Sequence, residues 1–384
     1  MHLIWATDDF TIGGRPYTGF PIVLHESMES AVEANQFLRH YLTRGAIGSN
    51  RSWPNTGRAI YDYFGFLEVH SLRWSDVDRG EEKTLVAAYR DYCLNDVNLA
   101  RNTVRQRLHY ICAFYDYSFR QGWVDRLPYN VEDRAVQRAD KGFLAHLDAR
   151  GNRLAVRDVM PRHHKSLPKF LSKEQVKTLL AGTRNDHHRM IIRLALQTGL
   201  RREEIATFPL AYVFNPDARH GTGRNVKVTL DPQDGTGMKT KGRKEREIFV
   251  SRRFMADLYR YSVLQRGELA AKSPIPQKTL FLTQDGLPYA NSGKSIEVMV
   301  RDNAFKVGIK SYPHMLRHTY ATHTLVAAQR NIEAFGIDPL VFLQRQLGHA
   351  SISTTMIYLH LINELVDTAV LSYDDEINDW LDAA

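Results

Sequence analysis

The chain has 384 residues, of which 43% are hydrophobic and 24% are charged. This composition excludes a disordered, collagen-like or coiled-coil protein, and the length predicts two or three domains. The two cysteines, Cys93 and Cys112, exclude a disulfide framework and a four-cysteine zinc site and fit a reducing cytosol. The chain starts without a secretion signal and has no run of about 18 apolar residues, so we expect no membrane partner and a cytoplasmic location.

The charge is unevenly distributed along the chain. The formal net charge is +8, but residues 363–384 contain seven acidic residues and no Lys or Arg. The remaining chain therefore carries about +15, which favours a polyanionic partner such as nucleic acid. Charge that serves only solubility would give the same composition.

The N-terminal third predicts a short irregular segment followed by a helical domain. Residues 1–26 contain many Gly and Pro breakers, and residues 27–130 show amphipathic helical periodicity. We expect one helix from about Ser27, a second that begins after an N-cap at Thr56, and two more over 82–94 and 102–121. Basic residues near the start of the last helix are candidates for DNA binding: Arg101, Arg105 and Arg107.

Residues 131–167 are rich in basic side chains and have few periodic apolar positions. We interpret them as a partly extended interdomain linker, in which Arg162 and Lys165 would lie beside a phosphate backbone. A flexible, solvated connector is the alternative.

Residues 168–370 predict a mixed domain. Strands at 225–231 and 245–251, separated by a Gly-rich turn, are expected to pair as a hairpin. Ser172 and Gln175 fit a capping box at a helix start. Helices are expected at 172–182, 185–198, 252–266, 292–308, 314–330, 338–347, 351–363 and 374–382. The fold class is therefore mostly α with a small β-sheet.

Arg201 follows Gly199 at a junction between two predicted helices, and Glu204 lies one turn later. An arginine at a helix start is well placed to bind an anion, and Glu204 is placed to hold either Arg201 or an adjacent backbone group. An ordinary surface Arg–Glu pair is the alternative.

His314 and Arg317 are three residues apart and share one helix face. This places a proton-transfer group beside a guanidinium. His318 and His323 are interpreted as packing or capping residues. Metal binding by these histidines is disfavoured because no acidic or cysteine ligand accompanies them.

The ordered set of Arg201, His314-x-x-Arg317, His349 and Tyr358 resembles the tyrosine recombinase (phage integrase) family. Tyr358 follows the Leu347-Gly348-His349 segment by nine residues. A lysine in a hairpin turn belongs to the family pattern, and the segment Lys239-Thr240-Lys241-Gly242-Arg243-Lys244 matches it, with Thr240 in place of a Gly. The match points to Lys241, with Lys239 and Lys244 as close alternatives.

The resemblance implies a site-specific DNA recombinase that acts without metal, ATP or another cofactor. Tyr358 would attack phosphorus to form a 3′-phosphotyrosyl intermediate while Arg201 and Arg317 clamp the phosphate. His314 would accept a proton, Lys241 would protonate the leaving oxygen, and His349 would bind the phosphate or orient the nucleophile. Glu204 would support the pocket.

The family also implies an arrangement of parts. Residues 27–130 resemble a core-binding domain and residues 168–370 a catalytic domain, which together would clamp duplex DNA at the nucleoid. The acidic segment 371–384 would dock on a neighbouring protomer in a tetramer, or pack on its own domain. An accessory DNA-bending or directionality factor is a further expected partner. A site-specific recombinase is favoured over a type IB topoisomerase, a telomere resolvase or a non-catalytic DNA-binding relative. Among the recombinases of the family, a mobile-element enzyme is favoured.

Overall fold

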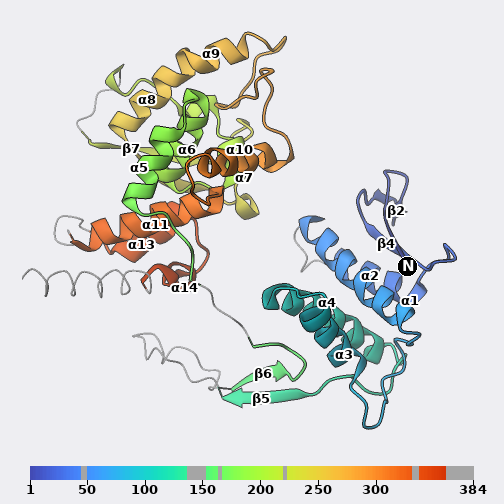
Figure 1. Ribbon diagram of the computed structural model, residues 1–384. Coiled ribbons are helices and arrows are strands. Elements are labelled where there is room, and N and C mark those ends of the chain that lie inside the picture. The colour runs from blue at the N-terminus through green and yellow to red at the C-terminus, as the bar shows by residue number, and fades with distance from the viewer. Residues whose placement is uncertain (45–49, 136–152, 163–166, 219–222, 331–336, 360–384) are drawn as a thin grey trace, which may run out of the picture. The chain divides into compact units, whose positions relative to one another are not determined.

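The computed structural model describes residues 1–384 except 45–49, 136–152, 163–166, 219–222, 331–336 and 360–384 (Figure 1). The chain forms two compact units, Met1–Lys165 and Ser166–Ala384. Each unit has its own buried core, so each is described by itself. Within the described ranges, no helix combines the length and the apolar character that crossing a bilayer requires.

The first unit begins with strands, where the sequence predicted an irregular segment. Strand β1 (His2–Trp5) pairs antiparallel with β4 (Pro21–Leu24), and β2 (Thr11–Ile12) pairs with β3 (Arg15–Pro16). The prediction for residues 1–26 was therefore wrong. Gly13 and Gly14, taken as breakers, form the turn between β2 and β3 with φ values of 58° and 75°, which a tight hairpin turn requires.

Helices follow over the range in which helical periodicity was found. They are α1 (Val32–Thr43), α2 (Trp53–Val69), α3 (Leu85–Asp91) and α4 (Arg101–Arg120), with a 3-10 turn (Asn50–Ser52) before α2 and a π-helical turn (Tyr92–Asp96) after α3. The predicted cap at Thr56 was wrong, because α2 already begins at Trp53. Pro54, which lacks an N–H, fits the first turn of that helix, and the Thr56 hydroxyl instead bonds the Ser52 carbonyl at 3.3 Å.

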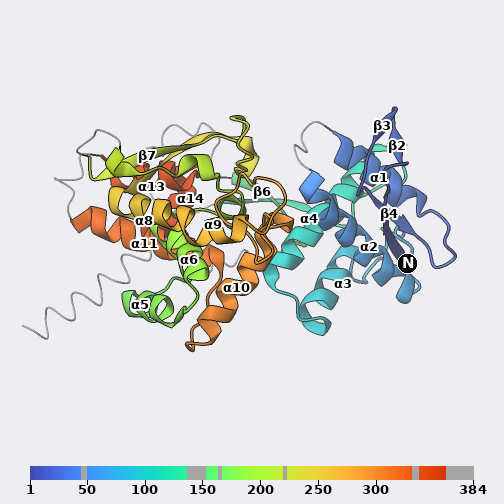
Figure 2. The same ribbon diagram turned by 90° about the horizontal axis from the view of Figure 1, so that it is seen from above.

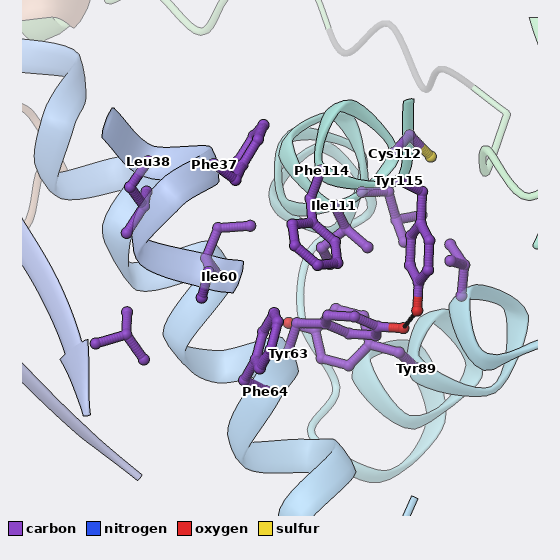
Figure 3. Close-up of a cluster of buried hydrophobic side chains, with 14 of the residues drawn as sticks. Phe37, Leu38, Ile60, Tyr63, Phe64, Tyr89, Ile111, Cys112, Phe114 and Tyr115 are labelled. Carbon is purple, nitrogen blue, oxygen red and sulfur yellow. Dashed lines mark hydrogen bonds between the residues drawn. The ribbon is translucent and has the colours of Figure 1, made fainter. Parts of the chain in front are cut away.

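Aromatic side chains from all four helices fill the core of the first unit (Figure 3). Phe37 of α1 meets Phe114 of α4 edge to face, and Tyr63 of α2 meets Tyr89 of α3 in the same way. The hydroxyls of Tyr63 and Tyr115 lie 2.7 Å apart, and both side chains are fully buried. Because each buried hydroxyl has a partner, the polar atoms do not destabilise this core.

The predicted linker contains a hairpin. Strand β5 (Val131–Ala135) pairs antiparallel with β6 (Arg153–Arg157), and the segment up to Lys165 belongs to the first unit. The Arg157 guanidinium bonds Asp116 of α4 at 2.6 Å. The prediction of partly extended structure in this linker is thus confirmed. The alternative of a flexible, solvated connector does not fit the two paired strands.

The second unit is built around the long helix α11 (Pro313–Arg330), which packs against α6 (Asp186–Thr198) and α13 (Pro339–Leu347). Helix α13 in turn packs on strand β8 (Arg246–Ser251). Figures 1 and 2 show α11 beside α6 and α13. Strand β7 (Asn225–Leu230) pairs antiparallel with β8, so the predicted hairpin is confirmed.

Shorter elements complete the second unit. In the part of this unit that the structure describes, the remaining helices are α5 (Lys173–Gly182), α7 (Arg202–Ala206), α8 (Arg252–Val263), α9 (Gln265–Ala270), α10 (Lys294–Phe305) and α14 (Ile352–Thr355). The 3-10 turns are Leu210–Tyr212, Pro216–Ala218, Lys241–Arg243 and Asn291–Gly293. The capping box of Ser172 and Gln175 is confirmed, with bonds of 3.2 and 2.9 Å. The predicted helix at 374–382 lies outside the described residues.

Candidate active site

The site begins at the sharp junction between α6 and α7. Gly199 ends α6 in the left-handed conformation with φ 66°, and its missing side chain leaves room for Tyr320 and Leu347, which a Cβ atom would meet at 2.5 and 2.7 Å. Arg201 follows two residues later, with extended backbone before α7. Glycine at 199 therefore permits the close packing that brings Arg201 toward α11 and α13.

Glu204 organises two arginines from beneath this junction. Its carboxylate accepts a bond from Arg201 at 3.0 Å and two bonds from Arg246 of β8, each at 2.7 Å. The side chain is only 1% exposed. Burial alone would raise the pKa of Glu204, but the hydrogen bonds and charge of Arg246, together with Arg201, lower it to about 2. Glu204 is thus a fixed anion that holds both guanidinium groups in place.

The guanidinium groups of Arg201 and Arg317 are both anchored at the C-terminal end of α13, on the Leu347–Gly348 turn. Arg201 donates to the Gly348 carbonyl at 3.1 Å, and Arg317 donates to the Leu347 carbonyl at 2.7 Å and to the Gly199 carbonyl at 2.6 Å. Burial, followed by the nearby charge of Arg201, lowers the pKa of Arg317 to about 9. Two like charges held this close together make a strong site for an anion.

Tyr358 lies shortly after α14 and is 2% exposed. Its hydroxyl is hydrogen-bonded to Nδ1 of His318 at 2.8 Å. The ring of His349 lies nearly parallel to the tyrosine ring, with centroids 6.4 Å apart, and Nδ1 of His349 is 2.9 Å from the Thr355 hydroxyl. Burial raises the pKa of Tyr358, whereas Arg317 and Arg201 act in the opposite direction. The tyrosine therefore lies within the field of both arginines.

The three histidines of α11 have different surroundings. The sequence named His314 as the proton acceptor, but the described bond of the Tyr358 hydroxyl is to His318, which had been interpreted as a packing residue. His314 is exposed and packs edge-on against His318, with ring centroids 4.3 Å apart. Its pKa is lowered by partial burial and then by Arg317, Arg201 and Lys241. His323 instead bonds the Leu171 carbonyl at 2.8 Å, as expected of a structural histidine.

The candidate lysines lie in the connection between β7 and β8. Lys239, Lys241 and Lys244 are all exposed, and Lys241 begins the turn Lys241–Arg243. Thr240 closes this turn through a 2.7 Å bond from its hydroxyl to the Lys244 carbonyl. The charge of Lys241 is among the causes that lower the pKa of His314, after burial and the two arginines.

Two of the predicted DNA-binding arginines are engaged within the first unit. Arg107 forms an ion pair with Asp62 and bonds the Tyr89 hydroxyl at 3.2 Å, and Arg105 bonds the Pro161 carbonyl. Both side chains therefore have partners within the first unit, and their role in DNA binding stays a prediction. Arg101 and Arg162 are exposed, and Lys165 lies outside the described residues.

Sequence reasoning missed Arg246, His318 and Thr355. A signal for Arg246 exists, because it shares the inward face of β8 with Ile248 and Val250 and is only 10% exposed. A charged residue on an apolar strand face needs a buried partner of opposite charge. Across the described ranges, no group of three or more His, Cys, Asp or Glu residues is placed to hold a metal ion.

Comparisons with known proteins identify the family. The model of the phage integrase family matches residues 169–364. Tyrosine recombinase XerD of Rickettsia conorii is 28% identical over 349 residues, which cover 88% of this chain and 97% of the relative. Transposase A from transposon Tn554 of Staphylococcus aureus is 28% identical over 269 residues, covering 68% of this chain and 67% of the relative.

Solved structures show the same fold. The Tn1549 transposon integrase in complex with transposon right end DNA has a TM-score of 0.56 at 16% identity, over 85% of this chain and 93% of that one. The XerH recombinase bound to a palindromic difH substrate has a TM-score of 0.55 at 16% identity, over 84% of this chain and 80% of that one. The protein belongs to the phage integrase family, and it is a tyrosine recombinase, an enzyme of site-specific DNA cleavage and religation.

Proposed function

We propose that Tyr358 is the nucleophile of this recombinase and that Arg201 and Arg317 bind the phosphate that it attacks. The observation that carries the proposal is the common anchoring of the two guanidinium groups on the Leu347–Gly348 turn, with the Tyr358 hydroxyl inside their field. Positive charge fixed in this way stabilises the extra negative charge that develops on the non-bridging oxygens during attack.

The proposed reaction conserves the phosphodiester bond energy. The tyrosine oxygen forms a bond to phosphorus and the bond from phosphorus to the 5′ oxygen breaks, which leaves a 3′-phosphotyrosyl linkage and a free 5′ hydroxyl. Lys241 would donate the proton to the leaving oxygen, and His314 and His349 would serve proton transfer and phosphate binding. A 5′ hydroxyl can then attack the linkage and restore the DNA, so the reaction needs no nucleotide as an energy source.

The proposed substrate is duplex DNA held by both units. In the structures that this chain resembles, the Tn1549 integrase and XerH are bound to DNA. The exposed basic residues Arg101, Arg162, Lys239 and Lys244 would contact the backbone, so affinity should fall with increasing salt. In this proposal, residues 27–130 are the core-binding domain and residues 168–370 the catalytic domain.

A mobile genetic element is the proposed origin, with a tetramer on paired DNA sites as the active assembly. The likeness to transposase A of Tn554 and to the Tn1549 integrase supports this origin. The segment 371–384 would join neighbouring protomers, and an accessory DNA-bending factor would set the direction of recombination. Such an enzyme would act at the bacterial nucleoid.

Covalent trapping tests the proposal. Wild type and Tyr358→Phe are incubated, without metal or nucleotide, with supercoiled DNA and with DNA from the ends of the encoding element. Denaturing gels should show a protein–DNA adduct at one sequence for wild type and none for Tyr358→Phe, while both bind DNA alike. Adducts scattered over any supercoiled DNA would instead indicate a topoisomerase, and an adduct formed by Tyr358→Phe would contradict the assignment of the nucleophile.

A further inference from the structure

We propose that His318 is a positioning residue for the nucleophile: its Nδ1 accepts a hydrogen bond from the Tyr358 hydroxyl and fixes the tyrosine oxygen beside Arg317. The proposal rests on the proposed function, in which Tyr358 attacks the phosphate. It adds a residue that the sequence motifs do not assign to the reaction.

The geometry supports a specific role for this bond. The hydroxyl of Tyr358 and Nδ1 of His318 are 2.8 Å apart, and the two ring centroids are 5.7 Å apart. Tyr358 is 2% exposed, and a buried hydroxyl without a partner is costly. The hydrogen bond to His318 therefore determines the position in which the buried Tyr358 hydroxyl is stable.

The position of His318 in the chain links the nucleophile to the phosphate clamp. His318 directly follows Arg317 on α11, whose guanidinium is bound to the Gly199 and Leu347 carbonyls. One rigid helix thus carries both a phosphate-binding group and the acceptor for the tyrosine hydroxyl. Sites built on rigid elements hold reacting groups more accurately than sites on loops.

The surroundings favour orientation over proton transfer. Burial, His314 and Arg317 lower the pKa of His318 to about 4, so the ring is neutral at physiological pH and one nitrogen remains an acceptor. Burial raises the pKa of Tyr358 at the same time. Transfer of the phenolic proton to such a weak base is strongly uphill, whereas accepting a hydrogen bond from it is not.

Substitutions at position 318 can separate the loss of the hydrogen-bond acceptor from the loss of the aromatic ring. In His318→Asn, the side-chain oxygen can take the place of Nδ1 but cannot take up a proton. His318→Ala removes the acceptor, and His318→Phe removes it while keeping an aromatic ring. The matched control is His323→Ala on the same helix, because His323 bonds the Leu171 carbonyl and not the tyrosine.

The measurement is the single-turnover cleavage rate at saturating DNA, with DNA affinity and thermal unfolding measured in parallel. We expect His318→Ala and His318→Phe to cleave about tenfold more slowly, the equivalent of one lost hydrogen bond of about 1.4 kcal/mol. His318→Asn should stay within about threefold of wild type, as should His323→Ala, and DNA affinity should not change. If His318→Ala does not fold, His318→Phe gives the same comparison.

A DNA substrate with sulfur in place of the 5′ bridging oxygen identifies the side of the reaction on which His318 acts. A thiolate leaves without a proton, so the substrate should restore cleavage by Lys241→Ala but not by His318→Ala. The inference would be overturned if His318→Ala and His318→Phe cleaved DNA at the wild-type rate. It would also be overturned if His318→Asn were as slow as His318→Ala, or if the sulfur substrate restored cleavage by His318→Ala. Absence of an adduct with wild type itself would instead refute the proposed function.

Discussion

Glu204 organises the site although it is too deeply buried to touch a substrate. Its carboxylate binds Arg201, which contacts the phosphate in the proposed function. The carboxylate also binds Arg246, which reaches it from strand β8. Removing one partner of a buried ion pair leaves the other charges uncompensated, which usually costs more than the pair contributes. Glu204 should therefore affect both stability and the position of Arg201.

We predict that Glu204→Gln lowers the free energy of unfolding by about 3 kcal/mol, measured by chemical denaturation at pH 7. The control is Glu247→Gln on strand β8, where the Glu247 carboxylate is 51% exposed and pairs with Lys227 at 2.7 Å. Such a surface pair should change stability by less than about 1 kcal/mol. Equal effects of the two substitutions would contradict the role of Glu204.

The pH dependence of this difference follows from the depressed pKa. The pKa of Glu204 falls from an ordinary 4.5 to about 2 in the folded protein, so its stabilising contribution is complete above pH 4.5. It is lost as the pH falls through about 2. The stability gap between wild type and Glu204→Gln should therefore narrow below pH 4.5.

Several site residues could be predicted from the sequence because their signals are local. The spacing of His314 and Arg317 on one helix and the Gly199–Arg201 junction are visible within a few residues. Arg246 was missed because its partner Glu204 lies 42 residues earlier, and His318 because Tyr358 lies 40 residues later. Contacts over such separations depend on tertiary packing, which periodicity does not encode.

At the scale of the secondary-structure elements, two glycines end helices beside the site. Gly199 ends α6 and Gly348 ends α13, both in the left-handed conformation. A Cβ atom at 348 would lie 2.6 Å from the Arg246 side chain. These helix ends therefore depend on glycine for backbone conformation and for space.

We predict that Gly199→Ala lowers the free energy of unfolding by about 2–5 kcal/mol, since the left-handed conformation costs about 1–2 kcal/mol and overpacking adds about 1–3 kcal/mol. Gly235→Ala is the control, because Gly235 has a similar φ of 76° but no atom within 4 Å of the added Cβ. Gly235→Ala should lower the free energy of unfolding only by the cost of the left-handed conformation. Thermal and denaturant unfolding compare the two, and equal losses would show that the packing against Tyr320 and Leu347 contributes nothing.

Regular amphipathic elements were predictable and irregular ones were not. Helices α5 and α6 and the hairpin of β7 and β8 match their predictions within one or two residues, because apolar spacing and, for α5, the capping box define them. Strands β2 and β3 have two residues each, which is too short for an alternating pattern. Strand β5 has the polar sequence Glu132-Asp133-Arg134, so it carries no strand signal.

At the scale of the whole molecule, the two units have separate cores. We predict that fragments 1–165 and 166–384 each unfold in one cooperative transition, because each retains a complete set of buried apolar side chains. A fragment 1–100 is the control, since it lacks α4 with Phe114 and Tyr115. Calorimetry or circular dichroism would measure the transitions, and non-cooperative unfolding of both larger fragments would refute the prediction.

The central claim is that Tyr358 becomes covalently joined to DNA. The most direct measurement is mass spectrometry of the trapped adduct after nuclease and trypsin digestion. The chain has no Lys or Arg after Arg345, so residues 346–384 form one peptide that contains both Tyr358 and Tyr373. Fragmentation of this peptide should place a nucleotide, linked through its 3′ phosphate, on Tyr358. A nucleotide on Tyr373 or on another peptide, or a 5′ linkage, would contradict the account.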